Sequence, residues 1–131
     1  MQGYSHDERM EATRLIIALL DSWGVSDGDQ LNLLGLPAGT RSRAIRGFRR
    51  DTPLPDHPDV HERVEHLAGI AEALRTSHPM NPAAGAVWMR QSNHRFGNRA
   101  PIDAMLEDGL QGIRAVRVHL DCAYDWDVNG R

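Results

Sequence analysis

Five of the chain's fifteen arginines fall in one short segment, and their spacing suits contact with a polyanion. The segment spans residues 41–51 and contains Arg41, Arg43, Arg46, Arg49 and Arg50 against a single acid, Asp51. At about 100° per residue, Arg43, Arg46 and Arg50 share one helix face, opposite Ala44, Ile45 and Phe48. Guanidinium groups bind phosphates, and those near a helix start can reach guanine edges. The pattern predicts a DNA-binding face formed by Thr40, Arg41, Arg43, Arg46 and Arg50; a solvated charged face is the alternative.

The residues before this segment complete the parts of a helix-turn-helix motif. Ser26 is a good N-cap for a short helix that carries three leucines and closes at Gly35. The run GLPAGT over residues 35–40 has two glycines and a proline and predicts a turn, after which a helix is expected from Arg41. The connection is longer than the usual three or four residues, and Gly47 costs the second helix about 1 kcal/mol relative to alanine.

Histidine and cysteine give little support for catalysis or metal binding. His57, His61 and His66 are close in sequence, but His61 and His66 would point about 140° apart on one helix, and no fourth ligand is evident. Cys122 is the single cysteine, so neither a disulfide framework nor a multi-thiolate zinc site can form within the chain. No phosphate-binding glycine loop and no hydrolase or metalloprotease motif is present. We expect no catalytic residue, metal or cofactor, and a metal enzyme using these histidines is the weakest alternative.

The C-terminal segment carries aromatic residues with no evident place in a core. Tyr124 and Trp126 alternate with Asp125 and Asp127 after the last predicted helix, which leaves YDWDVNGR as a tail. Trp and Tyr are favoured anchors in protein interfaces. The tail is therefore predicted either to insert into a partner or to fold back on the chain.

The elements that would position these residues are all helical. Helices are expected over residues 8–23, 26–35, 41–50, 58–77, 83–89, 101–108 and 110–123, and no strand-like alternation of useful length is present. The first helix is predicted to bury the stripe Ala12, Leu15, Ile16, Leu19 and Trp23. The long helix at 58–77 is expected to bury Val60, Val64, Leu67, Ala71 and Leu74, and residues 91–100 are expected to form an irregular loop.

The length of the chain fits one compact domain or two small lobes. The 131 residues carry a net charge of −3 and are 40% apolar, with no run long enough to span a membrane and no signal peptide. We expect a cytoplasmic protein. The predicted parts are a helix-turn-helix-like region at 1–52, a connecting long helix at 53–79, and a small helical C-terminal domain with a tail at 80–131.

A spaced set of residues in the C-terminal half resembles a known domain. The set comprises Trp88, Asn93, Phe96 with Gly97, Arg99 with Pro101, Met105 and Leu106 with Gly109, Val116 with Arg117, and Leu120 with Asp121. In this order and spacing it resembles the toxin-binding domain of the MbcA/ParS/Xre antitoxin family. The stretch from Leu33 to Pro82 is similar to the Xre-type helix-turn-helix and the helix behind it. His119 stands where the family commonly has tyrosine, Ser92 where it has proline, and Asn98 where it has glycine.

The resemblance implies an all-α antitoxin that forms a homodimer, represses its own operon by binding operator DNA, and holds a RES-domain toxin that consumes NAD. The antitoxin's C-terminal end obstructs the toxin's active site in such complexes. Carried over, the resemblance assigns toxin contact to Trp88, Asn93, Arg99, Arg117, Leu120, Asp121, Tyr124 and Trp126.

Two hypotheses therefore stand side by side. In the first, the chain is a non-enzymatic antitoxin whose C-terminal helix and tail enter the toxin's cleft. In the second, it is a free-standing helix-turn-helix regulator that uses the arginine face of residues 40–50 and has no toxin partner. Association with the product of the adjacent gene separates the two.

Overall fold

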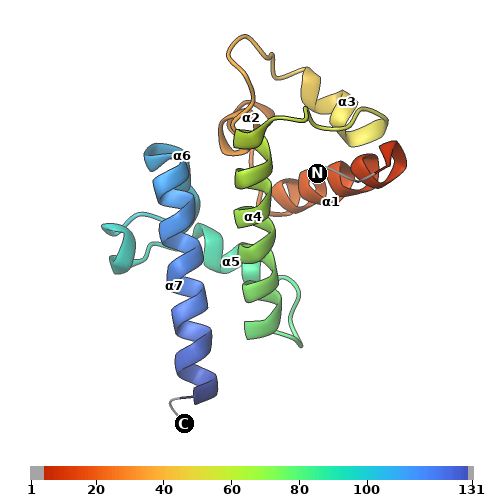
Figure 1. Cartoon of the computed structure of the whole chain (residues 1–131). Helices are drawn as coiled ribbons and strands as arrows, with labels where there is room; N and C mark the ends of the chain where they lie inside the picture. Colours follow the sequence, from red (N-terminus) through yellow and green to blue (C-terminus); the bar gives the residue numbers. More distant parts are fainter. Residues whose placement is uncertain (1–4, 130–131) are drawn as a thin grey trace. The chain divides into compact units, whose positions relative to one another are not determined.

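The computed structural model describes the backbone of residues 5–129 and the side chains of residues 5–122. Over these residues the chain forms α-helices and one 3₁₀ helix, with no strand, which confirms the predicted all-α class (Figure 1). The elements are α1 (His6–Ser22), α2 (Asp27–Leu34), α3 (Ala44–Arg50), α4 (Pro58–Ser77), α5 (Ala84–Arg90), η1 (His94–Phe96), α6 (Pro101–Asp108) and α7 (Leu110–Asn129).

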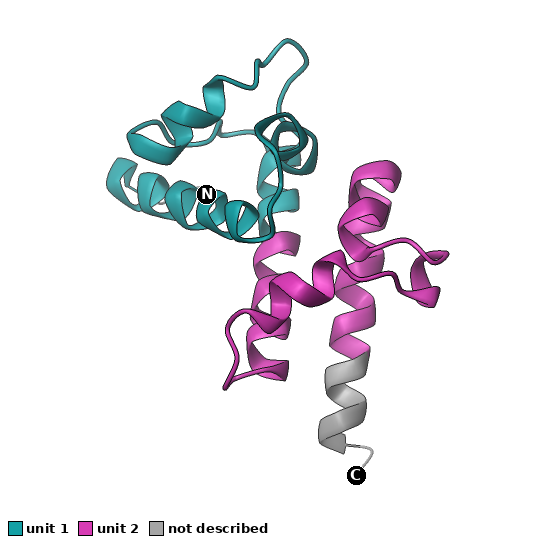
Figure 2. Ribbon diagram, turned by 180° about the vertical axis from the view of Figure 1, so that it is seen from behind, with its two compact units in different colours: residues 1–65 teal, residues 66–131 magenta. Residues whose placement is uncertain are grey.

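The chain divides into two compact units, coloured separately in Figure 2. Unit 1 is Met1–Glu65 and contains α1, α2, α3 and the start of α4; unit 2 is His66–Arg131 and contains the rest of α4 with α5, η1, α6 and α7. The boundary falls inside α4, whereas the sequence-based division placed boundaries at 52/53 and 79/80. None of the helices in the described part of the chain is both long and apolar enough to cross a membrane.

Caps set the ends of the first two helices; the sequence predicts Ser26 and Gly35 of the second helix, whereas it does not predict the Ser5 cap of the first helix. Ser5 and Glu8 form a reciprocal capping box at the start of α1, with the Glu8 N–H donating to Ser5 Oγ at 3.1 Å. Ser26 Oγ accepts from the Asp29 N–H at the start of α2. Gly35 ends α2 in the left-handed conformation at φ 65°, which favours glycine.

The predicted buried stripe of α1 is only partly confirmed. Ile16 and Trp23 are buried, but Leu15 is 64% exposed, and the helix buries Thr13, Ile17 and Leu20 instead. The helix has apolar residues on two adjacent faces. The face that turns inward contains Thr13, a polar residue that hydrophobic periodicity would place at the surface. Thr13 is satisfied there because its hydroxyl donates to the Arg9 carbonyl at 2.8 Å and accepts from the Leu54 N–H at 2.9 Å.

Helix α3 begins three residues later than predicted. Residues 41–44 make tight turns, in which the Ala44 N–H donates to the Arg41 carbonyl and the Arg46 N–H to the Arg43 carbonyl. No side chain caps the helix, because its N-cap residue is Arg43, whose guanidinium cannot accept a hydrogen bond. The Thr40 hydroxyl, before the turns, donates to the Pro37 carbonyl. The predicted opposite faces are confirmed within the helix: Ile45 and Phe48 are buried, and the arginines are exposed.

Unit 2 is built on close contact between its last two helices. Most of its buried apolar side chains come from α4, α5, α6 and α7, and Phe96 of η1 and Ala100 join them: Leu67, Ile70, Leu74, Met89, Ile102, Ala104, Met105, Ile113, Val116 and Leu120. Gly112 of α7 lies against the α6 backbone, where an added Cβ would be 2.3 Å from the Ala104 carbonyl oxygen. Glycine is therefore required at this position for α6 and α7 to pack as they do.

Two sequence-based expectations in unit 2 are corrected. Residues 94–96 form the 3₁₀ helix η1 inside the region expected to be irregular, because the Asn93 side chain accepts from the Arg95 N–H and caps it. The backbone of α7 continues to Asn129, beyond the predicted end at Ala123, so the segment predicted as a separate tail is helical to that point. The side chains of Tyr124 and Trp126 lie outside the described residues.

Two glycine substitutions test the α6–α7 contact. Gly112→Ala should lower the free energy of unfolding by about 1–3 kcal/mol, because the new methyl group must displace helix backbone. Gly28→Ala, at a helical position with open space around it, should instead raise stability by about 0.5 kcal/mol. Chemical denaturation monitored by circular dichroism measures both, and equal effects of the two substitutions would contradict the contact.

Candidate functional site

Three rings pack together at the centre of the C-terminal motif. Trp88 of α5, Phe96 of η1 and His119 of α7 form this aromatic cluster. Trp88 and His119 are stacked, with centroids 6.1 Å apart and planes 6° apart, and Phe96 meets the other two rings edge-on at 6.3 and 5.5 Å. Phe96 is buried, whereas Trp88 and His119 are partly exposed. The cluster fixes three elements of unit 2 to one another.

The histidine of this cluster is held in its neutral form. Burial lowers the pKa of His119 below its usual value, and the positive charges of Arg95 and His94 lower it further. A neutral imidazole stacks here as an ordinary aromatic ring.

Asn93 and Arg99 close the loop that carries η1. The Asn93 N–H donates to the Arg99 carbonyl at 3.1 Å, and the pair forms an isolated antiparallel bridge. The Arg99 guanidinium donates to the Phe96 carbonyl at 2.8 Å and, through two nitrogens, to the Asp108 carboxylate at 3.1 and 2.9 Å. This hydrogen-bonded pairing lowers the pKa of Asp108. The loop is thereby tied to the end of α6.

Arg117 spans from α7 to α4 within unit 2. Its guanidinium lies over Gly69, where an added Cβ would be 2.6 Å from Arg117 Nε. Arg117 Nη1 lies 3.1 Å from His66 Nδ1, and Arg117 Nε lies 3.8 Å from Asp121 Oδ2. Gly69, Arg117 and Asp121 line a shallow groove of about 280 Å³ with Glu72, Ala73 and Thr76.

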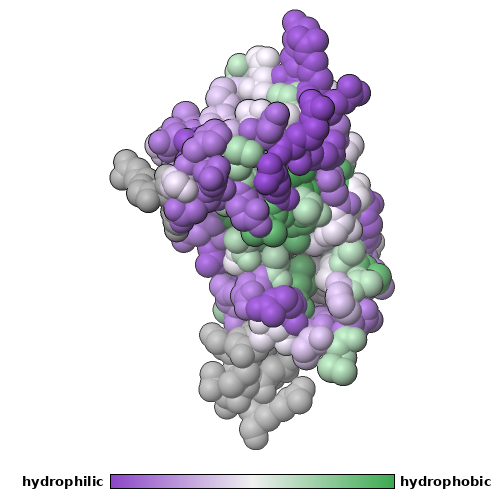
Figure 3. Space-filling model, turned by 90° about the vertical axis from the view of Figure 1, so that its right-hand side faces the viewer, coloured by the Kyte–Doolittle hydropathy of each residue, from purple (hydrophilic) through white to green (hydrophobic). Residues whose placement is uncertain are grey.

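The predicted toxin-contacting residues thus fall into different environments. Leu120 is buried in the core, and Asn93, Arg99 and Arg117 have partners within unit 2. Trp88 is half-buried and Asp121 is exposed. Hydrophobic side chains also reach the surface, as the green areas of Figure 3 show, and the largest exposed ones among the described residues are Leu15, Met80, Val87 and Val118.

In unit 1 the predicted arginine face is present. Arg41, Arg43, Arg46 and Arg50 are exposed, on α3 and the turns before it, and Thr40 is half-buried. The sequence reasoning missed Arg14 of α1, whose Nε donates to the Arg50 carbonyl at 2.8 Å and so places another exposed cation at the end of α3. Nothing in the local sequence pattern could indicate this, since the two residues are far apart in the chain.

The fifth arginine of the segment has a different role. Arg49 donates to two carboxylates, with Nε at 3.0 Å from Asp21 Oδ2 and Nη2 at 2.6 Å from Asp27 Oδ1. Both partners raise the pKa of Arg49, and the hydrogen bond lowers the pKa of Asp21. Arg49 therefore links α3 to α1 and α2.

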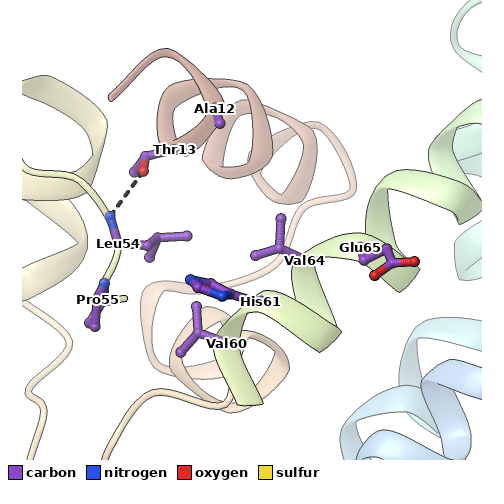
Figure 4. A pocket seen from close by; sticks show the side chains of 8 residues that line it. All are labelled: Ala12, Thr13, Leu54, Pro55, Val60, His61, Val64 and Glu65. Carbon is purple, nitrogen blue, oxygen red and sulfur yellow. Dashed lines mark hydrogen bonds between the residues drawn. The ribbon is translucent and has the colours of Figure 1, made fainter. Parts of the chain in front are cut away.

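A cavity of about 250 Å³ is lined by α1, by α4 and by the segment that connects α3 to α4 (Figure 4). Its lining is mostly apolar; His61 and Glu65 are its titratable members, and the Thr13 hydroxyl is occupied by the Leu54 N–H. His61 Nε2 lies 3.0 Å from Asp56 Oδ1 and makes no hydrogen bond. The lining offers no nucleophile paired with a base.

The three histidines proposed as metal ligands have separate neighbours. His57 Nδ1 accepts from the Asp59 N–H at 3.2 Å, His61 faces Asp56, and His66 faces Arg117. Among the side chains of residues 5–122, no three His, Cys, Asp or Glu gather closely enough to hold a metal ion.

The partly buried His119 makes the stability of unit 2 depend on pH. The pKa of His119 is lower in the folded chain than in the unfolded one, so the unfolded state binds its proton first as the pH falls below 6.5. Stability should be fully present above that pH and decline towards pH 5. His119→Phe should flatten this decline, and His78→Gln, at an exposed histidine, should not. The test is to measure the denaturation midpoint of each variant from pH 8 to pH 5. If the midpoint of His119→Phe falls with pH as steeply as that of the wild type, His119 is not the cause of the decline.

Comparison with known proteins identifies the C-terminal part of the chain. Residues 73–122 match the antitoxin Xre/MbcA/ParS C-terminal toxin-binding domain. The match contains the aromatic cluster, the Asn93–Arg99 loop and Arg117, begins after the Arg117 neighbours His66 and Gly69, and ends before Tyr124 and Trp126.

A relative is found that extends beyond this domain. The chain is 33% identical over 103 residues to the uncharacterized protein y4oB of Sinorhizobium fredii (strain NBRC 101917 / NGR234), an alignment that covers 79% of this chain and 76% of that protein. The chain therefore belongs to the same family as this relative, and its residues 73–122 match the antitoxin Xre/MbcA/ParS C-terminal toxin-binding domain.

Proposed function

We propose that the chain binds a RES-domain toxin and blocks the active site with which the toxin consumes NAD. The observation that carries the proposal is the toxin-binding domain at residues 73–122. The course of α7 supports it, because the backbone of the helix continues to Asn129, nine residues beyond Leu120, a buried residue of its described part. A long helix of this kind can lie in a groove of a partner.

The environments of the predicted contact residues suggest a division of roles. Asn93, Arg99 and Leu120 shape the domain, since each is occupied by contacts within unit 2. Asp121 is exposed and can meet the toxin directly. Tyr124 and Trp126 follow it on the same helix, so we assign the blocking role to this end of α7.

The proposal is tested with the protein encoded beside this chain. The two proteins should co-purify, and the NAD consumption of the neighbour should fall to background as this chain is added in equimolar amount. Absence of association, or unchanged NAD consumption, would refute the proposal. Size-exclusion chromatography with light scattering on the free chain also tests the predicted homodimer.

The end of α7 can be tested separately. Tyr124→Ala with Trp126→Ala should raise the Kd for the toxin by about 30-fold. This is the change expected when two aromatic anchors that together contribute about 2 kcal/mol of binding free energy are removed. Leu15→Ala is the matched control, since Leu15 is an exposed apolar residue of unit 1. Inhibition by the double variant at the wild-type concentration would show that this segment does not block the toxin.

A second function is favoured by the arginine face of unit 1. We propose that Thr40, Arg41, Arg43, Arg46 and Arg50 bind operator DNA, through which the antitoxin represses its own operon. The exposed guanidinium groups of α3, with Arg14 beside them, support phosphate contact. Should the neighbouring protein fail to associate while operator DNA binds, the chain is a free-standing regulator.

Salt dependence measures this second function. With a duplex of the sequence upstream of the chain's gene, Arg43→Gln with Arg46→Gln should weaken binding and reduce the slope of log K against log salt by about 2, because each arginine removed leaves one phosphate without its cation. Arg75→Gln, which removes an exposed arginine of unit 2, should leave the slope unchanged. A double variant with wild-type slope would exclude these arginines from DNA contact.

A further inference from the structure

The strongest polar cluster in the described residues lies beside the arginine face and is not part of it. Arg49 Nη2 donates to Asp21 Oδ1 at 2.8 Å and to Asp27 Oδ1 at 2.6 Å, and Arg49 Nε donates to Asp21 Oδ2 at 3.0 Å. We call these three residues the Arg49 cluster. Its members come from the end of α1, the start of α2 and the last turn of α3.

The buried side-chain amide of Gln30 also holds the Arg49 cluster in place. Gln30 is fully buried, and its Nε2 donates to Asp21 Oδ1 at 2.6 Å and to the Val25 carbonyl at 3.1 Å. The Asp21 carboxylate is therefore held from two sides and cannot simply rotate towards solvent. A bidentate guanidinium on a fixed carboxylate defines both a distance and an angle, which a single charge contact does not.

Helix α3 needs such a constraint. It has seven residues, too few to be stable alone, and no side-chain cap at its start. Its apolar contacts rest mainly on Ile45 and Phe48, the residues of the helix that are buried. Two side chains can fix which face turns inward and still leave the helix free to tilt.

We propose that Arg49, held by Asp21 and Asp27, is a positioning residue that sets the orientation of α3 for DNA binding and does not itself contact the phosphates. This inference rests on the proposed DNA-binding function. It assigns opposite roles to neighbouring arginines: Arg43 and Arg46 are free to meet DNA, and Arg49 is neutralised by two carboxylates.

Removal of the two carboxylates separates positioning from charge, because the two effects have opposite signs. Asp21→Asn with Asp27→Asn removes two negative charges beside a DNA-binding face and frees Arg49, so electrostatics alone would tighten DNA binding. Loss of positioning should weaken it instead, by about tenfold or more, since a misplaced helix forfeits several DNA interactions together. The matched control, Glu11→Gln with Asp29→Asn, removes two exposed carboxylates of unit 1 outside the cluster and should bind equally or more tightly.

A second variant keeps the charge of α3. Arg49→Lys retains one positive charge but cannot form the bidentate fork, so it should weaken DNA binding while the slope of log K against log salt stays at the wild-type value. Arg46→Gln should lower that slope by about 1. If Arg49 contacted a phosphate directly, Arg49→Lys would instead bind DNA with near-normal affinity.

The test uses the full chain and the duplex from upstream of its gene, with binding measured by fluorescence anisotropy over a range of salt. Circular dichroism melting confirms that each variant is folded at the assay temperature, and hydrogen exchange in the free protein should show faster exchange of α3 amides in the Asp21→Asn, Asp27→Asn variant. Tighter binding by that variant, or unchanged α3 exchange, overturns the inference while leaving DNA binding intact. Failure of the wild-type chain to bind the duplex overturns both.

Discussion

A guanidinium group can donate hydrogen bonds in several directions at once, and the short helices of this chain depend on that property. Helices of seven or eight residues are not stable in isolation and must be fixed by contacts at their ends. In unit 1 Arg49 joins α3 to α1 and α2, and in unit 2 Arg99 joins the η1 loop to the end of α6. The chain contains arginine and no lysine, so such multidirectional links are available throughout.

This dependence changes how the arginines are interpreted functionally. Arg99 and Arg117 belong to the motif of the toxin-binding domain, yet both have partners inside unit 2. Their place in the motif is explained by their structural role: they fix the conformation of the domain that a partner binds. In the function proposed above, direct contact is assigned to exposed residues such as Asp121 and to the end of α7 beyond it. In unit 1 the same distinction separates Arg49 from Arg43 and Arg46.

Much of the fold could be predicted from the sequence because its signals are local. Ser26, Gly35 and Pro101 mark helix ends through their own backbone chemistry, and the structure places helix ends at all three. The buried face of α1 could not be predicted, since Thr13 turns inward only because Leu54, far along the chain, supplies its hydrogen-bond partner. The Arg49 cluster was missed for the same reason. The predicted toxin-contacting and DNA-contacting residues rest on family resemblance and charge pattern, and the structure supplies their environments.

Hydrogen exchange of the full chain, with and without the protein encoded beside it, tests the central claim most directly. Our account predicts that binding protects the backbone amides of α7 in unit 2, and that amides of α3 in unit 1 exchange at the same rate in both states. Protection confined to α3, or no protection anywhere in the presence of saturating partner, would contradict the assignment of toxin binding to residues 73–122 and the helix end that follows them.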